Sequence, residues 1–307
     1  MNSLLSPRVT VVGSINMDLV VRCHKLPAPG QTLLAQSSSE FCGGKGANQA
    51  VAASLAGGDV SMIGAVGDDA FAASLLDNLK LHQVDYALVQ RHLGFASGLA
   101  VIAVDSNGQN SIMVVPGANS AVSRKMVQAA ETQIRKSDCL MVQLETPIES
   151  VLEAIRLARQ HGVRVILDPA PAPTALFPDL LQVDLLCPNE TEAAELTQMP
   201  VTNVEEAKAA SKQLQALGAK NVVITMGSEG AILCQENQAT HVPSIPVNAI
   251  DTTAAGDAFA GALAVRWAQT GDLLKAVGFA NVAGAIAASR AGAQASLATK
   301  EEIEATT

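Results

Sequence analysis

The sequence has 307 residues, which is enough for one large domain or two ordinary ones, since domains of about 150 residues are common. Hydrophobic residues make up 49% and charged residues 16%, a balance that predicts a large core and excludes a disordered chain. The formal net charge of −9 repels a phosphate backbone, so we expect no nucleic-acid partner and expect any bound phosphate to be held locally.

Two observations concern the cellular location of the protein. Its 5 cysteines are scattered and form no CxxC pair, which is typical of reduced thiols in the cytoplasm. Met1 to Thr10 lacks the basic and apolar regions of a signal peptide, and the longest lightly charged run, Ala276 to Ser289, is short for a bilayer. We therefore expect a cytoplasmic protein with no membrane partner, in which 276–289 is a buried helix.

The first third of the chain predicts a central strand and a small excursion from the main sheet. A β-branched run, Arg8 to Gly13, predicts the first strand, and Asn16 and Asp18 follow it in a predicted turn. The breaker cluster Leu26 to Gly30 lies between polar stretches that suit exposed strands. The pattern then predicts helix, strand and helix at 46–56, 60–66 and 70–80.

Two further extended segments, Ser97 to Asp105 and Asn110 to Pro116, are joined by Asn107-Gly108, a strong hairpin signal. They would complete the excursion, so we expect residues 17–42 and 97–116 to form a small β-sheet.

After Ala118 strands and helices alternate regularly. Helices are predicted at 123–135, 148–161, 204–217, 256–269 and 273–289, and strands at 138–144, 163–167, 184–187 and 221–225, with a hairpin around Gly230. Apolar strands that alternate with helices indicate an α/β fold, whose parallel sheet is covered on both faces. Such sheets bind ligands beyond the carboxyl ends of their strands.

The segment Asp251 to Phe259 is the most informative, because small residues lead directly into a predicted helix. Ala254, Ala255 and Gly256 would leave backbone N–H groups free at a helix N-terminus, which suits phosphoryl oxygens. Asp257 follows in the first turn, where it would accept a proton from an attacking hydroxyl. Together they predict a phosphoryl-transfer site. The alternative is an ordinary helix start that Asp257 only caps.

Two N-terminal segments would suit a polyol. The glycines of Gly43 to Gln49 permit close approach to a ligand, and Lys45 and Asn48 would donate hydrogen bonds to sugar oxygens. The segment lacks the GxxxxGK[ST] spacing of a Walker A loop. Asn16 and Asp18 would hold a pair of vicinal hydroxyls. Each segment has a structural alternative, since glycines and Asn or Asp residues also close turns.

Polar residues also follow other predicted strands. Glu145, Asn189 and Glu192 would order water bound to Mg²⁺, which usually keeps much of its hydration shell. Helix capping by Asn189 is the alternative for the last two. The glycine-bearing segment Thr225 to Gly230 would hold a nucleotide phosphate or form a plain turn.

Taken together, these segments resemble the ribokinase (PfkB-type) family of carbohydrate kinases over essentially the whole chain. The resemblance is carried by residues 13–18, 43–49, 143–145, 188–192, 251–259 and 292–294, in this order. It implies one domain over 1–307, a three-layer α/β/α sandwich with a β lid from about 17–42 and 97–116, and a homodimer formed through the lid. It also implies ATP-dependent phosphorylation of D-ribose at its terminal hydroxyl, with Mg²⁺ and K⁺.

The resemblance assigns roles residue by residue. Asp257 would be the base, and the amides of Ala254, Ala255 and Gly256 the anion hole. The sugar would contact Asn16, Asp18, Gly43, Gly44, Lys45, Asn48, Glu145 and Asp257. The nucleotide would contact Asn189, Thr225, Gly227, Ser228, Gly230, Gly256 and Asn281, with Glu192 reaching Mg²⁺ through water. A monovalent cation would be surrounded by Asp251, Thr253, Ala287, Arg290, Gly292 and Ser296.

Two other functions stay open at this point. One is a kinase for another small sugar such as 2-deoxyribose, and the other is a sugar or nucleotide sensor without catalysis on the same fold. Aromatic residues are only 3%, which disfavours a stacked nucleoside base and favours a polyol.

Overall fold

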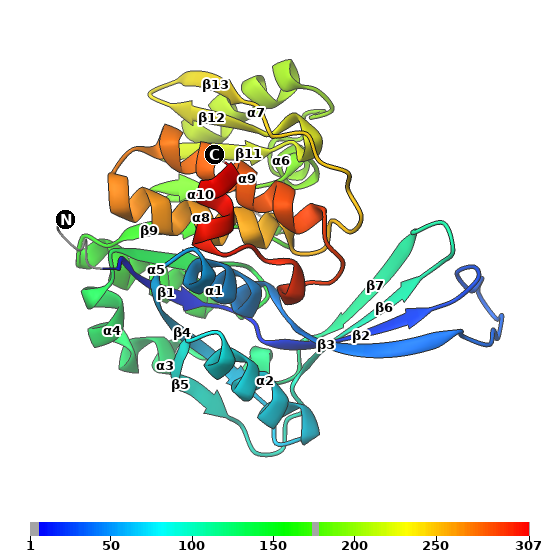
Figure 1. Cartoon of the computed structure of the whole chain (residues 1–307). Coiled ribbons are helices and arrows are strands. Elements are labelled where there is room, and N and C mark those ends of the chain that lie inside the picture. Colours follow the sequence, from blue (N-terminus) through cyan, green and yellow to red (C-terminus); the bar gives the residue numbers. More distant parts are fainter. Residues whose placement is uncertain (1–5, 174–177, 307) are drawn as a thin grey trace.

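A nine-stranded sheet forms the centre of the protein (Figure 1). The computed structural model describes residues 6–173 and 178–306, so the expectations for 1–5, 174–177 and 307 lie outside the described residues. In spatial order its strands are β13 (Gln238–Val242), β12 (Ala231–Gln235), β11 (Asn221–Thr225), β10 (Leu185–Leu186), β9 (Arg164–Leu167), β8 (Cys139–Val142), β1 (Arg8–Val12), β4 (Asp59–Val66) and β5 (Asp85–Arg91). Neighbours pair in parallel, except that β12 is antiparallel to β11 and β13.

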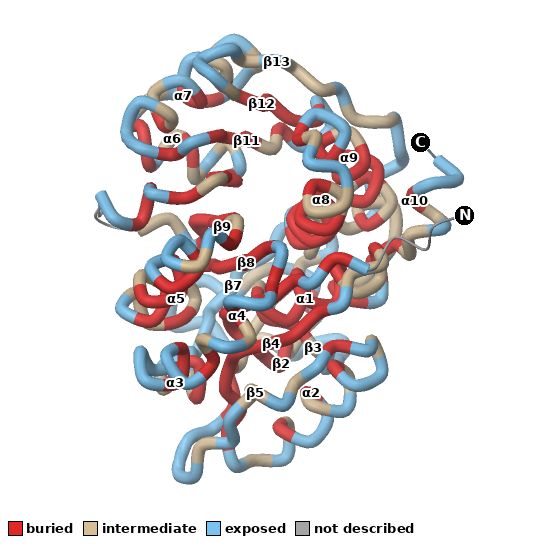
Figure 2. Tube along the Cα trace, turned by 90° about the vertical axis from the view of Figure 1, so that its left-hand side faces the viewer, coloured by how far each residue is buried: buried red, intermediate tan, exposed pale blue. Residues whose placement is uncertain are grey.

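Helices cover both faces of this sheet, which confirms the mainly parallel α/β architecture. One face carries α1 (Lys45–Leu55), α2 (Ala70–Leu81), α8 (Ala255–Thr270), α9 (Leu273–Ala288) and α10 (Lys300–Thr306). The other carries α3 (Arg124–Ala129), α4 (Glu131–Lys136), α5 (Ile148–Gln160), α6 (Glu190–Thr197) and α7 (Val204–Ala216). Two large apolar clusters fill the interfaces, and Figure 2 shows the buried central strands between helices with exposed outer sides. No helix in the described ranges is long and apolar enough to cross a membrane.

A second, four-stranded sheet extends from the end of the main one (Figure 1). Its strands are, in order, β3 (Ser37–Gly43), β2 (Asn16–Arg22), β6 (Gly98–Val104) and β7 (Asn110–Val115). Strand β2 continues the chain from β1 after only three residues, so the small sheet begins at the carboxyl end of a central strand. This position brings its first residues to the edge where parallel sheets bind ligands.

Some local predictions were wrong. Asn16 and Asp18 lie in strand β2 and not in a turn, because β3 and β6 pair with both sides of that segment. The helix expected at 123–135 divides into α3 and α4 at Ala130. No prediction covered β5, an edge strand with mixed exposure, or the short helix α10, while α6 matches the helix-capping alternative given for Asn189.

Helices α1 and α8 pack closely at a glycine, and this contact positions the start of α8. A Cβ atom added at Gly261 would lie 2.6 Å from Ala52 Cβ and 2.8 Å from the Gln49 carbonyl oxygen. A larger residue would therefore force the two helices apart.

We expect Gly261→Ala to lower the free energy of unfolding by about 1–3 kcal/mol, because the added methyl overpacks this contact. The matched control is Gly278→Ala in α9, where an added Cβ meets no atom within 4 Å. That change should stabilise the protein by about 0.5–1 kcal/mol, the usual gain of Ala over Gly inside a helix. Urea unfolding measures both, and equal effects would contradict the packing argument.

Candidate active site

Polar residues converge at the carboxyl edge of the main sheet. The chain leaves β1 for β4 and β5 on one side and later returns to β8 on the other, which makes a switch point of the kind where α/β sheets bind ligands. Glu145 follows β8, Asp168 follows β9 and Asn189 follows β10, while Thr225 ends β11. The start of α8, with Asp257, faces the same edge.

The carboxylate of Asp257 is buried and held by two amides of α1. Asn48 Nδ2 donates to its Oδ2 at 2.9 Å, and Gln49 Nε2 donates to its Oδ1 at 3.1 Å. Burial raises the pKa of Asp257, and the charge of Lys45 and these two hydrogen bonds oppose that rise. The result is a carboxylate that is desolvated yet oriented, as a general base requires.

Lys45 is the cation at the centre of this acidic group. Its Nζ lies 4.0 Å from Asp168 Oδ2. Burial opposes its charge, but Asp168, Asp257 and Glu145 outweigh burial and raise the pKa of Lys45, so it stays protonated. Burial raises the pKa of Asp168 to about 7 even though Lys45 lowers it.

Strand β2 places Asn16 and Asp18 beside these groups. Asn16 Oδ1 accepts a hydrogen bond from Asn119 Nδ2 at 2.7 Å. Burial, followed by the negative charges of Glu145 and Asp257, raises the pKa of Asp18 to about 7. A Cβ at Gly43 would lie 2.1 Å from an Asp18 carboxylate oxygen, so only glycine leaves space for this side chain.

Glu145 forms hydrogen bonds to the segment between β1 and β2 and to the start of α1. Its Oε2 accepts hydrogen bonds from Ser14 Oγ at 2.5 Å and from the Lys45 backbone N–H at 3.3 Å. These bonds connect the end of β8 to the glycine-rich start of α1.

The N-terminus of α8 has the features of an anion site. Ala254 adopts the left-handed conformation with φ of 58°, and a Cβ at Gly256 would meet no atom within 4 Å. Open space at Gly256 leaves room for a ligand against bare backbone. One correction applies to the expectation of three free amides, because the N–H of Ala255 donates to the Thr252 carbonyl at 3.2 Å.

Two adjoining cavities meet at this helix start. One, of about 200 Å³, is lined by Lys45, Asp168, Cys187, Asn189, Glu192, Thr225, Thr252, Ala254, Gly256, Asp257 and Ala260. The second, of about 430 Å³, includes Thr225, Gly227, Ser228, Gly230, Gly256 and Asn281 among its lining residues. The residues that the sequence analysis assigned to a nucleotide therefore line these two cavities, and Asn189 lines the smaller one. The amide of Asn281 donates to the Val242 carbonyl at 2.8 Å.

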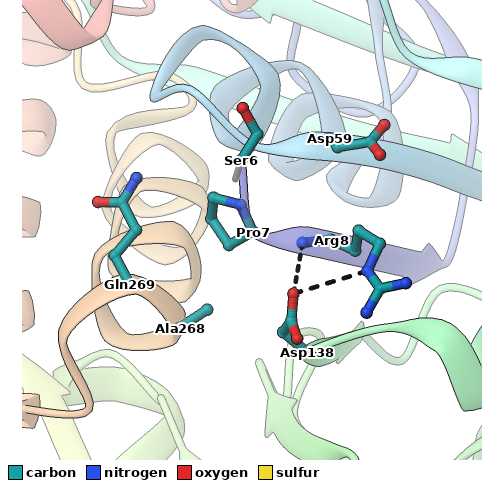
Figure 3. Close-up of a pocket in the computed structure, with 7 residues that line it drawn as sticks. All are labelled: Ser6, Pro7, Arg8, Asp59, Asp138, Ala268 and Gln269. Carbon is teal, nitrogen blue, oxygen red and sulfur yellow. Dashed lines mark hydrogen bonds and ion pairs between the residues drawn. The ribbon is translucent and has the colours of Figure 1, made fainter. Parts of the chain in front are cut away.

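A larger cavity lies at the opposite edge of the sheet. Figure 3 shows its lining residues near the start of β1, where Arg8 pairs with Asp138. It measures about 830 Å³, but its lining includes no glycine-rich helix start and no buried carboxylate. The cavity of about 200 Å³ is the better candidate for the chemistry, because the perturbed titratable groups Lys45, Asp168 and Asp257 line it.

In the regions predicted to bind Mg²⁺ and a monovalent cation, the candidate ligands also form hydrogen bonds within the protein. Asn189 and Glu192 form a capping box, with Asn189 Oδ1 accepting from Glu192 N–H at 2.8 Å and Glu192 Oε2 from Asn189 N–H at 2.9 Å. Asp251 accepts hydrogen bonds from the N–H groups of Thr253 and Gly292, at 2.9 and 3.0 Å. In the described ranges, no three acidic, His or Cys side chains form a ready metal-ligand set.

The region predicted to hold a monovalent cation is a tight loop. The Arg290 side chain forms an ion pair with Glu302 at 2.6 Å, so only its backbone faces the loop for a ligand role. Ser296 is fully buried and donates to the Ala293 carbonyl at 2.7 Å, which leaves its oxygen able to accept or coordinate. Ala287 lies in the last turn of α9.

Sequence reasoning missed several residues of this site. Asp168 directly follows a strand, as Glu145 nearly does, so the same signal would have found it. Gln49 stood inside the quoted glycine-rich segment but was given no role. Gln143 lay in the quoted segment 143–145 but was given no role, and Asn119 carries no local signal, because its partner Asn16 is distant in the chain.

The raised pKa of Asp18 predicts how stability depends on pH in the ligand-free protein. An unfolded carboxyl ionises near 3.8 and the folded one near 7, so the folded state binds more protons between these values and stability falls as pH rises. We expect Asp18→Asn to remove part of this fall and to stabilise the protein at pH 8 by on the order of 2 kcal/mol.

Urea unfolding at pH 4 to 8 measures this dependence. The control is Asp77→Asn, the same chemical change on the exposed side of α2. An Asp18→Asn variant with the slope of the parent protein would contradict the burial argument.

Comparisons with known proteins agree with this geometry. The model of the pfkB family carbohydrate kinases matches residues 6–300. A deoxyribokinase of Salmonella typhi is 38% identical over 295 residues, which cover 96% of each chain. A ribokinase of Staphylococcus aureus strain COL is 37% identical over 302 residues, covering 97% of this chain and 99% of its own. The structure of Arabidopsis thaliana ribokinase complexed with ribose and ATP has 31% identity and a TM-score of 0.91, with 98% of both chains covered. The chain therefore belongs to the pfkB family of carbohydrate kinases and is a sugar kinase.

Proposed function

We propose that this kinase transfers the γ-phosphoryl group of ATP to the terminal hydroxyl of D-ribose and so forms ribose 5-phosphate. The observation that carries the proposal is the buried Asp257 carboxylate, held by Asn48 and Gln49, directly beside the bare start of α8. A desolvated base next to an anion site suits phosphoryl transfer to an alcohol.

In the proposed reaction the sugar hydroxyl attacks the γ-phosphorus while Asp257 takes its proton. The new bond joins the sugar oxygen to phosphorus, the bond to the β–γ bridging oxygen breaks, and ADP leaves. The N–H groups of Ala254 and Gly256 stabilise the charge on the transferring group, joined by that of Ala255 if its bond to Thr252 opens. Lys45 offsets the negative charge of the surrounding carboxylates.

Mg²⁺ would neutralise charge on the nucleotide phosphates. Glu192 and Asp168 line the smaller cavity, and carboxylate oxygens are suitable partners for Mg²⁺-bound water. Glu192 Oε2 already accepts the Asn189 N–H, which fixes the direction of its carboxylate. Omission of Mg²⁺ with excess chelator should abolish turnover.

Ribose is proposed over 2-deoxyribose because of Asp18 and Asn16. Asp18 is 92% buried by area, yet its carboxylate makes no hydrogen bond to any described residue. A buried carboxylate is stabilised by donors, and vicinal hydroxyls at carbons 2 and 3 of ribose would supply them. The alternative substrate, 2-deoxyribose, is favoured by the similarity to the Salmonella typhi deoxyribokinase.

A monovalent cation such as K⁺ is proposed beside the anion site, among Asp251, Thr253, Ala287, Arg290, Gly292 and Ser296. Asp251 supports this because burial, which raises its pKa, is outweighed by hydrogen bonds from Thr253 and Gly292, so the carboxylate stays ionised. Loop carbonyls would complete the shell. Turnover in K⁺ should exceed turnover in tetramethylammonium at equal ionic strength.

The small sheet is proposed as a lid over the sugar and as the contact of a homodimer. Large apolar residues of β7 are exposed on both sides of the strand, with Ile112 at 55% and Met113 at 64%. One side would cover the substrate and the other a second copy. Analytical ultracentrifugation should give a dimer, and of Ile112→Asp and Met113→Asp only the substitution on the dimer side should dissociate it.

A cytoplasmic location is proposed from two features: ATP is an intracellular co-substrate, and the five cysteines form no disulfide. Cell fractionation tests it.

The role of Asp257 predicts a specific kinetic defect. Asp257→Asn removes the proton acceptor but keeps the size of the side chain, so kcat should fall by about 10²–10⁴ with the KM for ribose changed only a few-fold. A coupled ADP assay measures both constants, with Asp77→Asn as the control. Retention of the parent kcat by Asp257→Asn would contradict the proposal.

The sugar preference is tested with matched substrates. We expect kcat/KM for ribose to exceed that for 2-deoxyribose by at least about tenfold, because the missing 2-hydroxyl leaves a buried polar group unpaired. In Asp18→Asn the ratio should shrink toward one. A reversed ratio in the parent protein would assign it to 2-deoxyribose, and an equal ratio would contradict the proposed role of Asp18.

A further inference from the structure

Two neighbouring residues of α1 hold the two oxygens of Asp257 separately. Asn48 Nδ2 donates to Oδ2 and Gln49 Nε2 donates to Oδ1. Each of these amides is itself held by another side chain. Gln294 Nε2 donates to Asn48 Oδ1 at 3.0 Å, and Gln143 Nε2 donates to Gln49 Oε1 at 2.5 Å.

The hydrogen bonds fix which way the Gln49 amide points. Its Nε2 also donates to Asp168 Oδ2 at 2.7 Å, so one nitrogen bridges two carboxylates. The reversed amide would place Oε1 against both carboxylates and Nε2 against the donor of Gln143, which is unfavourable on both sides. Gln49 and Gln143 are 1% and 0% exposed, so water cannot replace these bonds.

We propose that Gln49 is a positioning residue for the reaction, which sets the orientation of the Asp257 carboxylate, and that Gln143 acts through Gln49 by fixing its amide. The proposal rests on the proposed role of Asp257 as the base. Because Oδ1 and Oδ2 each accept a hydrogen bond from α1, the carboxylate is held in one orientation toward an attacking hydroxyl.

Packing alone does not require these two glutamines. Burying two amides in the core is unfavourable unless they are hydrogen-bonded, and apolar residues of similar volume would fill the space at lower cost. The partners of Gln49 are two carboxylates and the amide of Gln143, whose own buried Oε1 has no hydrogen-bond partner among the described residues. The arrangement therefore serves the carboxylates.

The charged groups around Asp257 define the expected effect of losing Gln49. Lys45 of α1 lowers its pKa and Glu145, after β8, raises it, while Asp18 of β2 and Asp168, after β9, are the other carboxylates of this cluster. The Gln49 bond favours the ionised form of Asp257. Its loss should raise the pKa, and a base with a higher pKa is ionised only at higher pH.

The test uses Gln49→Met, which keeps the length of the side chain without an amide. The Asp257 carboxyl is titrated by carbon-13 NMR in the ligand-free protein and assigned by comparison with Asp257→Asn. We expect its pKa to rise by about one pH unit, since hydrogen bonds to charged groups contribute about that much. The acid limb of kcat/KM should move to higher pH, and kcat should fall about tenfold with the KM for ATP within twofold.

Two further variants separate positioning from general damage. Gln133→Met removes an amide that donates to Ser61 Oγ far from the site, and it should leave the titration unchanged. Gln143→Met should move the Asp257 titration in the same direction by less, and it should add nothing in the Gln49→Met background.

Two outcomes would overturn the proposal: an unchanged Asp257 titration in folded Gln49→Met, or full additivity of the Gln49 and Gln143 variants. The NMR readout requires no turnover. Absence of pentose phosphorylation by the parent protein would instead contradict the proposed function, so the two failures are distinguishable.

Discussion

One half-buried cation among several carboxylates is the interaction on which the site depends. Lys45 faces Asp168, Asp257 and Glu145, and Asp18 lies near the last two. A single positive charge cannot compensate all of them, so burial raises the pKa of Asp18 and Asp168 to about 7. The site is therefore short of hydrogen-bond donors and positive charge. A sugar supplies hydroxyl donors to such a site, which links the acidity of the site to the class of its substrate.

The fold makes this convergence possible through small residues. The parallel sheet brings the ends of β8, β9 and β10 to one edge, but the side chains meet only because α1 and α8 lie in close contact beside it. Gly261 permits that contact, and Asn48 and Gln49 then reach Asp257 across it. A bulkier interface would hold the same residues apart, so the packing of two helices sets the geometry of the base.

The sequence predicted what depends on local chemistry. Apolar strands alternating with helices indicated the parallel sheet, and small residues before Asp257 indicated the helix start. The strand containing Asn16 and Asp18 was missed because its partners β3 and β6 decide its conformation. The contact between Gln49 and Asp168 was missed for a related reason. They meet across 119 positions of the chain, and no spacing rule reports such a contact. Asp168 could nevertheless have been predicted as a site residue, since it follows a strand directly.

The choice of amides around Asp257 has a consequence for proton transfer. Asn and Gln side chains donate hydrogen bonds but neither gain nor lose protons near neutral pH. On the α1 side the hydrogen-bond partners of Asp257 are such amides, and Gln49 Nε2 donates to both Asp257 and Asp168. This bridge orients both carboxylates without itself carrying a proton between them. The amides thus hold in place two carboxylates that line the same cavity.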